Sequence, residues 1–346
     1  MDHQPNRRAE RRPQQGLPLP TEDWFAVLAS AGAAPSAHNT QPWRFMVWPE
    51  VVELHVDPAR TLSVADPTGR EARISCGAAL FNLRMALRAR DIDPLVALLP
   101  WRSHPTLLAV VRPQGMRIAT PQELALFRAI PRRHSHRRPF HSAPVPQAAL
   151  RSIVYAAGVE GGYLRLLPDP PTVSAVAAIV GRADQVQRHS QEYQDELADW
   201  TFTGGGRTDG VPAAAGGPQP EPGALLAMRD FAPAGSSRPT GHYESDPLLG
   251  VLLSAGDTPR DQLRSGQALQ RALLTATDHG VGASMLSAPI ELPAARAALR
   301  DLLDGAMWPQ LVLRFGSALP TAASPRRPVS EFAQLAAADR IASAGA

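Results

Sequence analysis

Apolar and polar positions in the first third of the chain follow two different periods. Apolar residues recur at helical spacing over residues 21–32 and again over 71–90, which predicts two amphipathic helices. Between them, residues 43–48 and 51–56 alternate apolar and polar side chains as the two strands of a hairpin do. The apolar run 106–111 has the length of a further strand. The predicted order is helix, loop, two strands, helix and strand.

The second half of the chain repeats this order with longer connections. Its predicted helices cover residues 145–157, 171–180, 184–200 and 259–280, and its predicted strands cover residues 163–167, 248–253 and 310–315. Gly181 and Gly280 are expected to end the second and the fourth of these helices. Since both halves share this order without obvious identity in sequence, we interpret the chain as two fused, diverged copies of one unit, residues 21–130 and 131–330.

Three stretches lie outside this pattern. Residues 1–20 are basic and rich in proline but have no apolar stretch of the kind a secretory signal needs, so we expect a disordered tail. Residues 331–346 are expected to form a short, Ala-rich tail at the other end. Residues 204–238 are rich in Gly, Pro and Ala and are far longer than an ordinary connection. We interpret this last stretch as a functional lid rather than as disorder.

Composition narrows the class of protein. The 346 residues are ample for one or two domains, and charges or prolines break the apolar runs before they reach membrane-spanning length, so no transmembrane helix is expected. The single cysteine, Cys76, excludes an intrachain disulfide and suits a cytoplasmic protein. All 35 basic residues are arginines, yet the net charge is only +3. Aromatic residues make up 5% of the chain and do not interleave with the arginine clusters. A nucleic-acid surface is therefore not favoured.

Residues 35–45, PSAHNTQPWRF, place polar side chains between two prolines and directly before aromatic residues. Each proline fixes its own φ and disfavours a helical residue before it, so the segment is predicted to be an extended loop. Such polar residues often only complete a turn. The aromatic residues favour instead a loop beside a flat ligand with polar edges, with the candidate residues Pro35, Ser36, Asn39, Gln41, Pro42, Trp43, Arg44 and Phe45.

A second segment, residues 133–137 with the sequence RHSHR, combines guanidinium, imidazole and hydroxyl groups within one turn. Arginine side chains beside a hydroxyl and backbone N–H groups suit a phosphate dianion, although a solvated basic connector is the plain alternative. The histidines raise the alternative of a metal site, but the arginines would repel a cation and no carboxylate or thiolate is nearby, so no metal is expected. The candidate residues are Arg133, His134, Ser135 and Arg137, with a second basic pair at Arg326 and Arg327.

Together with the turn Pro289, Ile290 and Glu291, these segments resemble the flavin-dependent nitroreductase superfamily. The family motifs are PSxxNxQPW, R-[HS]-S-x-[KR], P-I-E-G and a closing basic pair, and this chain departs from them at Leu292, which stands in place of the last glycine. The chain resembles in particular the Acg-type nitroreductases of actinobacteria, in which two nitroreductase-like halves are fused. The resemblance runs from about Trp24 to Phe332.

The resemblance implies an α+β fold, a three-layer α/β/α sandwich in which two half-domains with mixed, mainly antiparallel sheets form an intramolecular pseudo-dimer. It implies one FMN per chain in the seam between the halves. The FMN phosphate would be held by the R-H-S-x-R segment and the basic pair, and Arg137 would stabilise the reduced ring. A backbone amide at the Pro289–Glu291 turn would meet the ring, so the side chain of Glu291 is expected to be secondary.

The loop residues have implied roles as well. Ser36, Asn39 and Gln41 would hydrogen-bond to the ring edges or the ribityl chain of FMN, while Pro35, Pro42 and Trp43 would pack around the ring. Since this chemistry needs no side chain as nucleophile or base, no catalytic residue is assigned.

Two functions follow from the resemblance. The first is an FMN-dependent oxidoreductase that passes two electrons from NAD(P)H to a nitroaromatic, quinone or similar acceptor in ping-pong fashion. The second is an FMN-sequestering or stress-related flavin-binding protein with little turnover, because Acg-type proteins carry a covering segment and residues 204–238 are the candidate for one. The expected partners are NAD(P)H and a small acceptor, with neither nucleic acid nor membrane, and the internal pseudo-dimer leaves both monomer and homodimer open.

Overall fold

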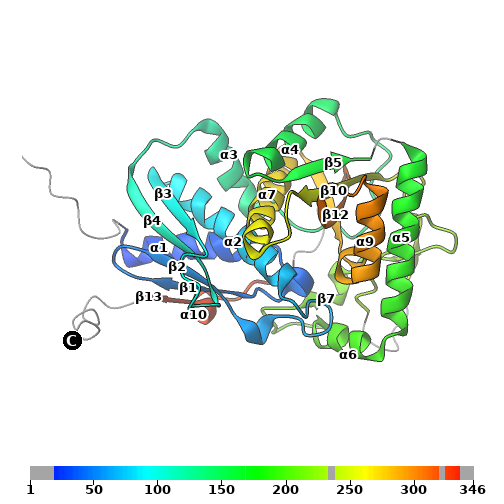
Figure 1. Cartoon of the computed structure of the whole chain (residues 1–346), viewed down its shortest axis with the longest axis horizontal. Helices are drawn as coiled ribbons and strands as arrows, with labels where there is room; N and C mark the ends of the chain where they lie inside the picture. The colour runs from blue at the N-terminus through cyan, green and yellow to red at the C-terminus, as the bar shows by residue number, and fades with distance from the viewer. Residues whose placement is uncertain (1–18, 168, 233–237, 319–323, 336–346) are drawn as a thin grey trace, which may run out of the picture.

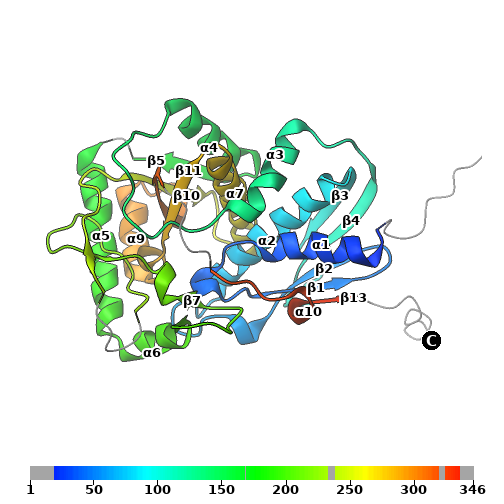
Figure 2. The ribbon, with the colours of Figure 1, turned by 180° about the vertical axis from the view of Figure 1, so that it is seen from behind.

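The computed structural model describes residues 19–167, 169–232, 238–318 and 324–335. The chain forms two α+β units that pack against each other through their central helices (Figures 1 and 2). The first unit contains α1 (Thr21–Gly32), β1 (Trp43–Val47), β2 (Val52–Val56), α2 (Arg70–Arg88), β3 (Ile92–Leu98), β4 (Leu107–Met116) and α3 (Pro121–Ala129), with short 3₁₀ turns at Ala37–Asn39, Pro58–Arg60 and Ile130–Arg132.

The second unit follows directly along the chain. It contains α4 (Gln147–Val159), β5 (Tyr163–Leu166), α5 (Pro170–His189), α6 (Gln191–Asp199), β10 (Leu248–Ser254), α7 (Pro259–Asp278), β11 (Val281–Leu286), α8 (Ala288–Glu291), α9 (Pro293–Leu302) and β12 (Trp308–Ser317). Between α6 and β10 run the short pieces β6 (Thr201–Phe202), β7 (Val211–Pro212), a 3₁₀ turn (Ala213–Ala215), β8 (Gln219–Pro220) and β9 (Thr240–Gly241). The last described elements are α10 (Val329–Phe332) and β13 (Ala333–Leu335).

The two sheets share one topology. The first sheet has the order β13-β1-β2-β4-β3, and the second, taken from its far edge, has the order β5-β10-β12-β11. Apart from the parallel pair β13 and β1, all neighbouring strands in both sheets are antiparallel. In each unit one long helix, α2 or α7, joins the second strand to the third. This repeated arrangement is what the shared order of predicted elements indicates for a fused duplication.

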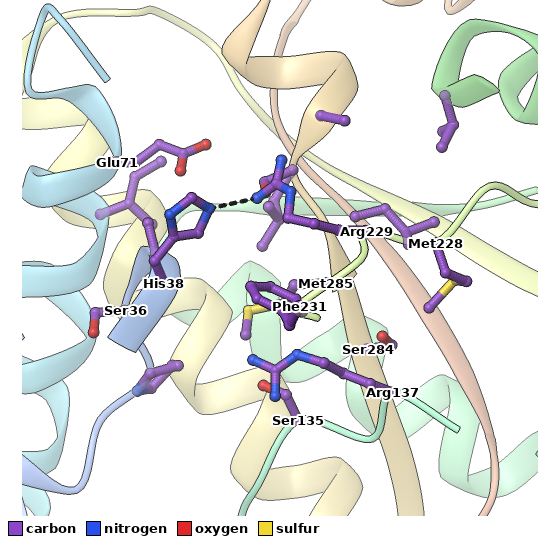
Figure 3. A pocket seen from close by; sticks show the side chains of 18 of the residues that line it. Ser36, His38, Glu71, Ser135, Arg137, Met228, Arg229, Phe231, Ser284 and Met285 are labelled. Carbon is purple, nitrogen blue, oxygen red and sulfur yellow. Dashed lines mark hydrogen bonds between the residues drawn. The ribbon is translucent and has the colours of Figure 1, made fainter. Parts of the chain in front are cut away.

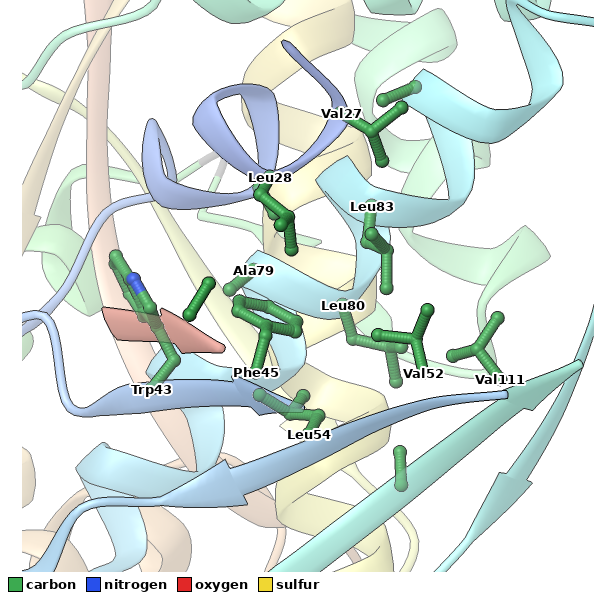
Figure 4. Close-up of a cluster of buried hydrophobic side chains, with 14 of the residues drawn as sticks. Val27, Leu28, Trp43, Phe45, Val52, Leu54, Ala79, Leu80, Leu83 and Val111 are labelled. Carbon is green, nitrogen blue, oxygen red and sulfur yellow. The ribbon is translucent and has the colours of Figure 1, made fainter. Parts of the chain in front are cut away.

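The α+β fold is confirmed, with a difference between the units in how the sheets are covered. In the second sheet, Val251 packs among side chains of α5 and α9, while the adjacent Leu252 packs among side chains of α4 and α7. Successive residues of a strand face opposite sides of the sheet, so this unit has the three layers α/β/α. In the first sheet, the apolar side chains face α1 and α2 on one side, where Trp43, Phe45, Val52 and Leu54 meet Leu80 and Leu83 (Figure 4).

The central helices cross at two glycines. Gly77 and Gly266 each occupy the eighth position of their helix, counted from Arg70 and from Pro259. A Cβ on Gly77 would fall well inside van der Waals contact of the Leu263 carbonyl oxygen, and a Cβ on Gly266 would clash in the same way with the Ile74 carbonyl oxygen. The backbones approach so closely because neither residue has a side chain. The crossing therefore relates the two units by an approximate two-fold axis.

The carboxyl-terminal segment crosses back to the first unit. Phe45 of β1 pairs with Ala333 of β13, and Phe332 lies edge-on to the Phe45 ring. The expectation of a tail beginning at residue 331 is therefore wrong for residues 331–335, because apolar side chains there complete the first core. Most of the expected amino-terminal tail, residues 1–18, and the remainder of the other tail, residues 336–346, lie outside the described residues.

Several elements differ from the sequence prediction. The strand β3 and the helices α3 and α9 were not predicted, and α5 continues through Gly181 to His189. A Cβ at Gly181 would meet nothing within 4 Å, so this glycine is an ordinary helical position and not a stop. The break between α5 and α6 falls instead at Ser190, whose hydroxyl accepts a hydrogen bond from the Tyr193 N–H (3.3 Å) and so caps α6. Among the described helices, none combines the length and apolarity needed to cross a bilayer.

Candidate functional site

Two neighbouring cavities lie in the seam between the units. The larger encloses about 990 Å³, open solvent at its mouth included, and runs between the loop after α1, the first turns of α2 and the end of β11. Figure 3 shows its wall, with Ser36 and His38 from the first unit facing Ser135 and Arg137 from the second. The smaller encloses about 690 Å³ and shares Pro35, Ser36, Ser135 and Arg137 with the larger. The seam therefore brings residues 35–39 and 133–137 together around one slot.

The smaller cavity is lined by three guanidinium groups that have no anionic partner. Arg133 is buried and Arg137 and Arg326 are partly buried, and within the described residues none of the three has a carboxylate within 4 Å. The Nε atoms of Arg133 and Arg326 are also buried without a hydrogen-bond partner there. Withdrawal from water lowers the pKa of Arg133 to about 9 and those of Arg137 and Arg326 to about 10, with neighbouring arginines adding to the effect at Arg133 and Arg137.

Such a cluster is costly unless an anion completes it. Uncompensated buried charge is unfavourable, and guanidinium groups form short, strong bonds with phosphate oxygens. The Ser135 hydroxyl and His134 line the same cavity. The backbone of this segment is held along β11, since Ser135 forms a β-bridge with Ala283 and the His136 N–H donates to the Ala283 carbonyl (2.8 Å). The arrangement has the charge and the donors to bind an anion; we call Arg133, Ser135, Arg137 and Arg326 the anion cradle.

The polar residues of the loop mainly fasten it in place. Asn39 accepts a hydrogen bond from the Arg326 guanidinium (3.0 Å) and donates to the Gly210 carbonyl (2.9 Å). Gln41 is fully buried, donates to the Thr208 carbonyl (2.9 Å) and lines neither cavity. Positive φ angles at His38 (45°), Asn39 (58°) and Gln41 (51°) are uncommon for residues with side chains and show that these contacts impose the loop shape. In this structure the Gln41 side chain holds the loop through Thr208 and Arg327, and its bond to a flavin stays a prediction.

The aromatic end of the motif points away from the cavities. Pro42, Trp43 and Phe45 are buried, and the last two belong to the core under α1 and α2, while Arg44 is exposed on the other face of β1. Arg44 and Phe45 instead border a separate hollow beside α10. Neither Pro42 nor Trp43 lines either of the two cavities, and their packing around a ligand stays a prediction. Residues that follow Gln41 already belong to a strand, and strand alternation directs every second side chain to the core.

The turn after β11 meets the larger cavity through its first residues. Ser287 and Ala288 line the wall, whereas Ile290 packs in the second core. The N–H groups of Ile290 and Glu291 both donate to the Ser287 carbonyl (2.8 and 3.0 Å), and Pro289 has no N–H. The backbone amides of the Pro289–Glu291 turn are thus engaged within the turn. The wall that a ring would meet here is formed by Ser287 and Ala288.

The side chain of Glu291, expected to be secondary, is the centre of a buried polar network. It is 1% exposed and pairs with Arg229 at 2.7 Å. The Gln187 amide and the Tyr193 hydroxyl donate to the same carboxylate (2.5 and 3.3 Å). Burial alone would raise the pKa of Glu291, but the Arg229 guanidinium holds it below its ordinary value. Arg229 also donates to the Ser287 hydroxyl (2.9 Å).

Arg229 and Phe231 come from the segment between α6 and β10 and reach into the larger cavity. Figure 3 shows Arg229 bonded to His38 and Phe231 lying beside Arg137. The Arg229–His38 distance is 2.9 Å, and the Arg137 guanidinium lies 4.9 Å from the centre of the Phe231 ring. Burial, with the adjacent Arg229, lowers the pKa of His38 to about 3, so this imidazole is neutral. The expected lid, residues 204–238, is described over residues 204–232, which we call the covering segment. Residues 233–237 lie outside the described residues.

Glu71 is a further cavity residue that the sequence analysis missed. It is the second residue of α2, lines the larger cavity and pairs with Arg70 at 3.0 Å. Burial, together with the nearby Glu291 carboxylate, raises the pKa of Glu71 to about 8. The only signal in the sequence was the expected helix start at this point, which does not reveal that the first turn faces a cavity. Arg229 likewise gave no signal, because its partner Glu291 is 62 positions away.

The closing basic pair divides its roles. Arg326 reaches the anion cradle, but Arg327 turns away from it. The Arg327 guanidinium donates to the Gln41 carbonyl (3.2 Å) and pairs with Glu331 at 3.3 Å, and its N–H donates to the Gln41 side chain (2.9 Å). Arg327 therefore anchors the loop and α10. Within the described residues no group of three or more His, Cys, Asp or Glu side chains is placed to hold a metal ion.

The fold and the site define a two-unit α+β protein with an arginine-lined cavity at one end of a slot between its units. Mycobacterium tuberculosis H37Rv has a protein named "Putative NAD(P)H nitroreductase Rv3131" that is 34% identical to this chain over 315 residues, covering 89% of this chain and 90% of the relative. A second protein of that organism, named "Putative NAD(P)H nitroreductase acg", is 30% identical over 325 residues, covering 91% and 96%. The chain belongs to the nitroreductase family. No protein-family model matches it.

Solved structures give a weaker overlap. A nitroreductase with bound FMN from Bacteroides fragilis aligns with a TM-score of 0.35 at 13% identity, covering 57% of this chain and 92% of that one. A nitroreductase with bound FMN from Desulfitobacterium hafniense aligns with a TM-score of 0.38 at 12% identity, covering 60% and 95%. The family assignment rests on the two mycobacterial relatives, whose identity extends over both units.

Proposed function

We propose that this chain is an FMN-binding oxidoreductase that transfers two electrons from NAD(P)H to a nitroaromatic, a quinone or a similar small acceptor. The observation that carries the proposal is the anion cradle, whose arginines have no carboxylate partner in the described structure and lie at one end of a slot between the units. FMN has a phosphate dianion at one end and a flat ring at the other, which fits a cradle that opens into a larger cavity. The relatives named NAD(P)H nitroreductase support the same reading.

The residues present divide the work of holding such a cofactor. Arg133, Ser135 and Arg326 would bind the phosphate. Arg137, which lines both cavities, would place a positive charge beside the ring, where electron uptake adds negative charge. FMN, when bound, supplies the hydride chemistry, and the protein contributes position, charge and a dry environment. Water is excluded on the cavity side by Met228, Phe231 and Met285, which line the wall.

The covering segment favours a second candidate function, an FMN-sequestering protein with little turnover. Arg229 and Phe231 line the larger cavity beside Ser287, in the space where a nicotinamide or acceptor would have to approach the ring. The ion pair between Arg229 and Glu291 and the bonds of Arg229 to His38 and Ser287 hold the segment there. Turnover requires that these contacts open; sequestration requires that they stay closed.

The cofactor claim is tested by the double variant Arg133→Ala with Ser135→Ala. Each lost charge-assisted hydrogen bond removes about 1.5–3 kcal/mol of binding free energy, so the purified variant should retain far less FMN after dialysis than the parent protein. Arg132→Ala is the matched control, because Arg132 is an adjacent, exposed arginine that pairs with Asp278 at 3.4 Å and lines neither cavity. Circular dichroism checks that the variant is folded. Equal flavin content in the double variant and the parent would place the phosphate elsewhere.

A spectroscopic titration separates the two functions. NADH or NADPH is added anaerobically to flavin-loaded protein while the absorption band of oxidised flavin is followed. Loss of the band with either nucleotide, and its return on adding a quinone, supports the oxidoreductase. A band that persists with both nucleotides but disappears on chemical reduction supports sequestration.

A further inference from the structure

A second hollow lies at the opposite side of the α2–α7 crossing and is built from equivalent elements. We call it the counterpart groove; it encloses about 880 Å³, open solvent included. Its wall includes Pro94, Val96 and Leu98, which follow the end of α2 (Arg88) by six, eight and ten residues. The wall of the larger cavity includes the continuous run Ser284, Met285, Leu286, Ser287 and Ala288, which follows the end of α7 (Asp278) by six to ten residues.

The remaining walls correspond in the same way. The larger cavity takes Pro35 and Ser36 from the loop after α1, and the groove takes Glu160 and Gly161 from the loop after α4. The sixth residue of α2, Ser75, lines the cavity, and the sixth residue of α7, Arg264, lines the groove. The approximate two-fold axis through the glycine crossing therefore maps one hollow onto the other.

The groove presents hydrogen-bond donors and a positive charge. Its one carboxylate, Glu160, is used on both oxygens, by Arg84 at 2.6 Å and by Arg271 at 3.0 Å. The Gln267 carbonyl oxygen accepts a bond from Arg84 (2.8 Å), which leaves the amide nitrogen as the polar atom of Gln267 that can face a ligand. Arg264 is exposed at the edge of the groove. The two guanidinium groups that line the groove, Arg84 and Arg264, exceed the one carboxylate of the described lining by one charge, and Arg271 pairs with that carboxylate from outside the lining.

The groove also has an apolar wall, formed by Pro94, Val96, Leu98 and Val159. Donors on one side and apolar atoms on the other match a small anion with an apolar body. None of the described residues that line the groove repeats the R-x-S-x-R cradle, and the covering segment contributes no residue to it. A dinucleotide or a flavin phosphate therefore has no cradle here, while a single carboxylate has Arg264 and Gln267.

We propose that the counterpart groove binds a small amphipathic anion, a carboxylate carried on an aromatic or branched apolar body. The carboxylate lies between the Arg264 guanidinium and the Gln267 amide, and the apolar body rests on Val96 and Leu98. Because β3 belongs to the first unit and α7 to the second, the ligand bridges the two units. This site is separate from the proposed flavin site and does not depend on it.

Benzoate titrated into the full-length protein in a calorimeter tests the proposal, with benzyl alcohol as the uncharged probe of the same shape. Benzoate should bind and benzyl alcohol should bind at least about tenfold more weakly, since it loses the charge-assisted bonds. Arg264→Ala should weaken benzoate binding by about tenfold. Arg151→Ala, an exposed arginine on α4, is the matched control and should leave the affinity unchanged.

Two readouts keep this site distinct from the flavin site. Benzoate in the groove should leave the absorption spectrum of bound flavin unchanged, whereas benzoate stacked on the ring would shift it. Absence of benzoate binding, equal affinity of Arg264→Ala and the parent, or a spectral shift that accounts for all the binding would overturn the proposal. Failure of the proposed flavin function would instead show as loss of flavin with benzoate binding intact.

Discussion

The larger cavity and the counterpart groove are two versions of one place in a duplicated fold. Both are bordered by the same helix pair and by the strand that follows each helix. Glu71, at the second position of α2, lines the larger cavity, whereas Arg260, at the second position of α7, does not line the groove; at the sixth position the two hollows have Ser75 and Arg264. Only the larger cavity opens to an anion cradle and is closed by a covering segment. The repeated topology thus leaves one hollow on each side of the helix crossing, and a few side chains determine which ligand each hollow can bind.

The largest effect is expected where the covering segment is held in the larger cavity. Arg229→Ala leaves the Glu291 carboxylate buried without its partner, and breaking a buried ion pair in this way costs about 3–5 kcal/mol. The free energy of unfolding, measured by urea denaturation, should fall by about that amount, and flavin reduction by NADPH should become faster in stopped-flow measurements because the segment opens. Arg207→Ala is the control, because its pair with Asp209 lies in the same segment but near the surface.

If the covering segment regulates access, the loss of unfolding free energy and the faster flavin reduction should occur together in Arg229→Ala. If Arg229→Ala lost stability but reduced no faster, the ion pair would be purely structural and the contrast between the closed cavity and the open groove would have no bearing on turnover.

The next effect tests the axis that relates the two hollows. Gly266→Ala and Gly77→Ala each insert a methyl group against a backbone carbonyl that cannot move aside, so each should lower the free energy of unfolding by at least about 2 kcal/mol. Both hollows should be affected, seen as weaker binding of flavin and of benzoate. Gly181→Ala in α5 has open space around it and should be stabilising by up to about 1 kcal/mol. Tolerance of both crossing variants would mean that the helices do not meet as described.

A smaller effect separates the cradle from the groove. Arg326→Ala removes one of the three cradle guanidinium groups and should weaken FMN binding by about tenfold to a hundredfold, measured by flavin fluorescence on titration of apoprotein. Benzoate binding should be unchanged, because the groove has no contact with Arg326. Arg264→Ala should show the reverse pattern. Equal losses of both ligands in either variant would contradict the separation of the sites.

A final effect is a pH dependence that arises in the larger cavity. The pKa of Glu71 is raised to about 8 in the folded protein, so the folded state keeps a proton that the unfolded chain releases near 4.5. The stability contributed by that proton is fully present below about pH 4.5 and is lost as the pH rises toward 8. Glu71→Gln cannot titrate, so its unfolding free energy should decline less than that of the parent across this window. The equivalent Arg260→Gln on α7 should follow the parent.

The sequence by itself was sufficient to predict features that depend only on residues close together in the chain, such as helices and clusters of charge. Periodicity over residues 21–32, 71–90 and 259–280 located helices that the structure contains, since an amphipathic stripe is a local property. The R-H-S-x-R segment predicted a cluster of charges, since its arginines lie within one turn, and Arg133 and Arg137 line one cavity. The repeated order of elements predicted a duplication, and the two sheets have the same strand order.

Only the tertiary structure decided which side chains face the slot. Trp43 belongs to the same motif as Ser36, yet strand alternation sends it to the core while Ser36 lines the cavity. Arg229 becomes a site residue only because the covering segment folds back onto Glu291, 62 positions along the chain. Whether a charge is buried or paired is a property of contacts between distant segments, and no local pattern encodes it. For that reason the motif indicated the region, and the packing of the two units decided which of its residues line the cavities.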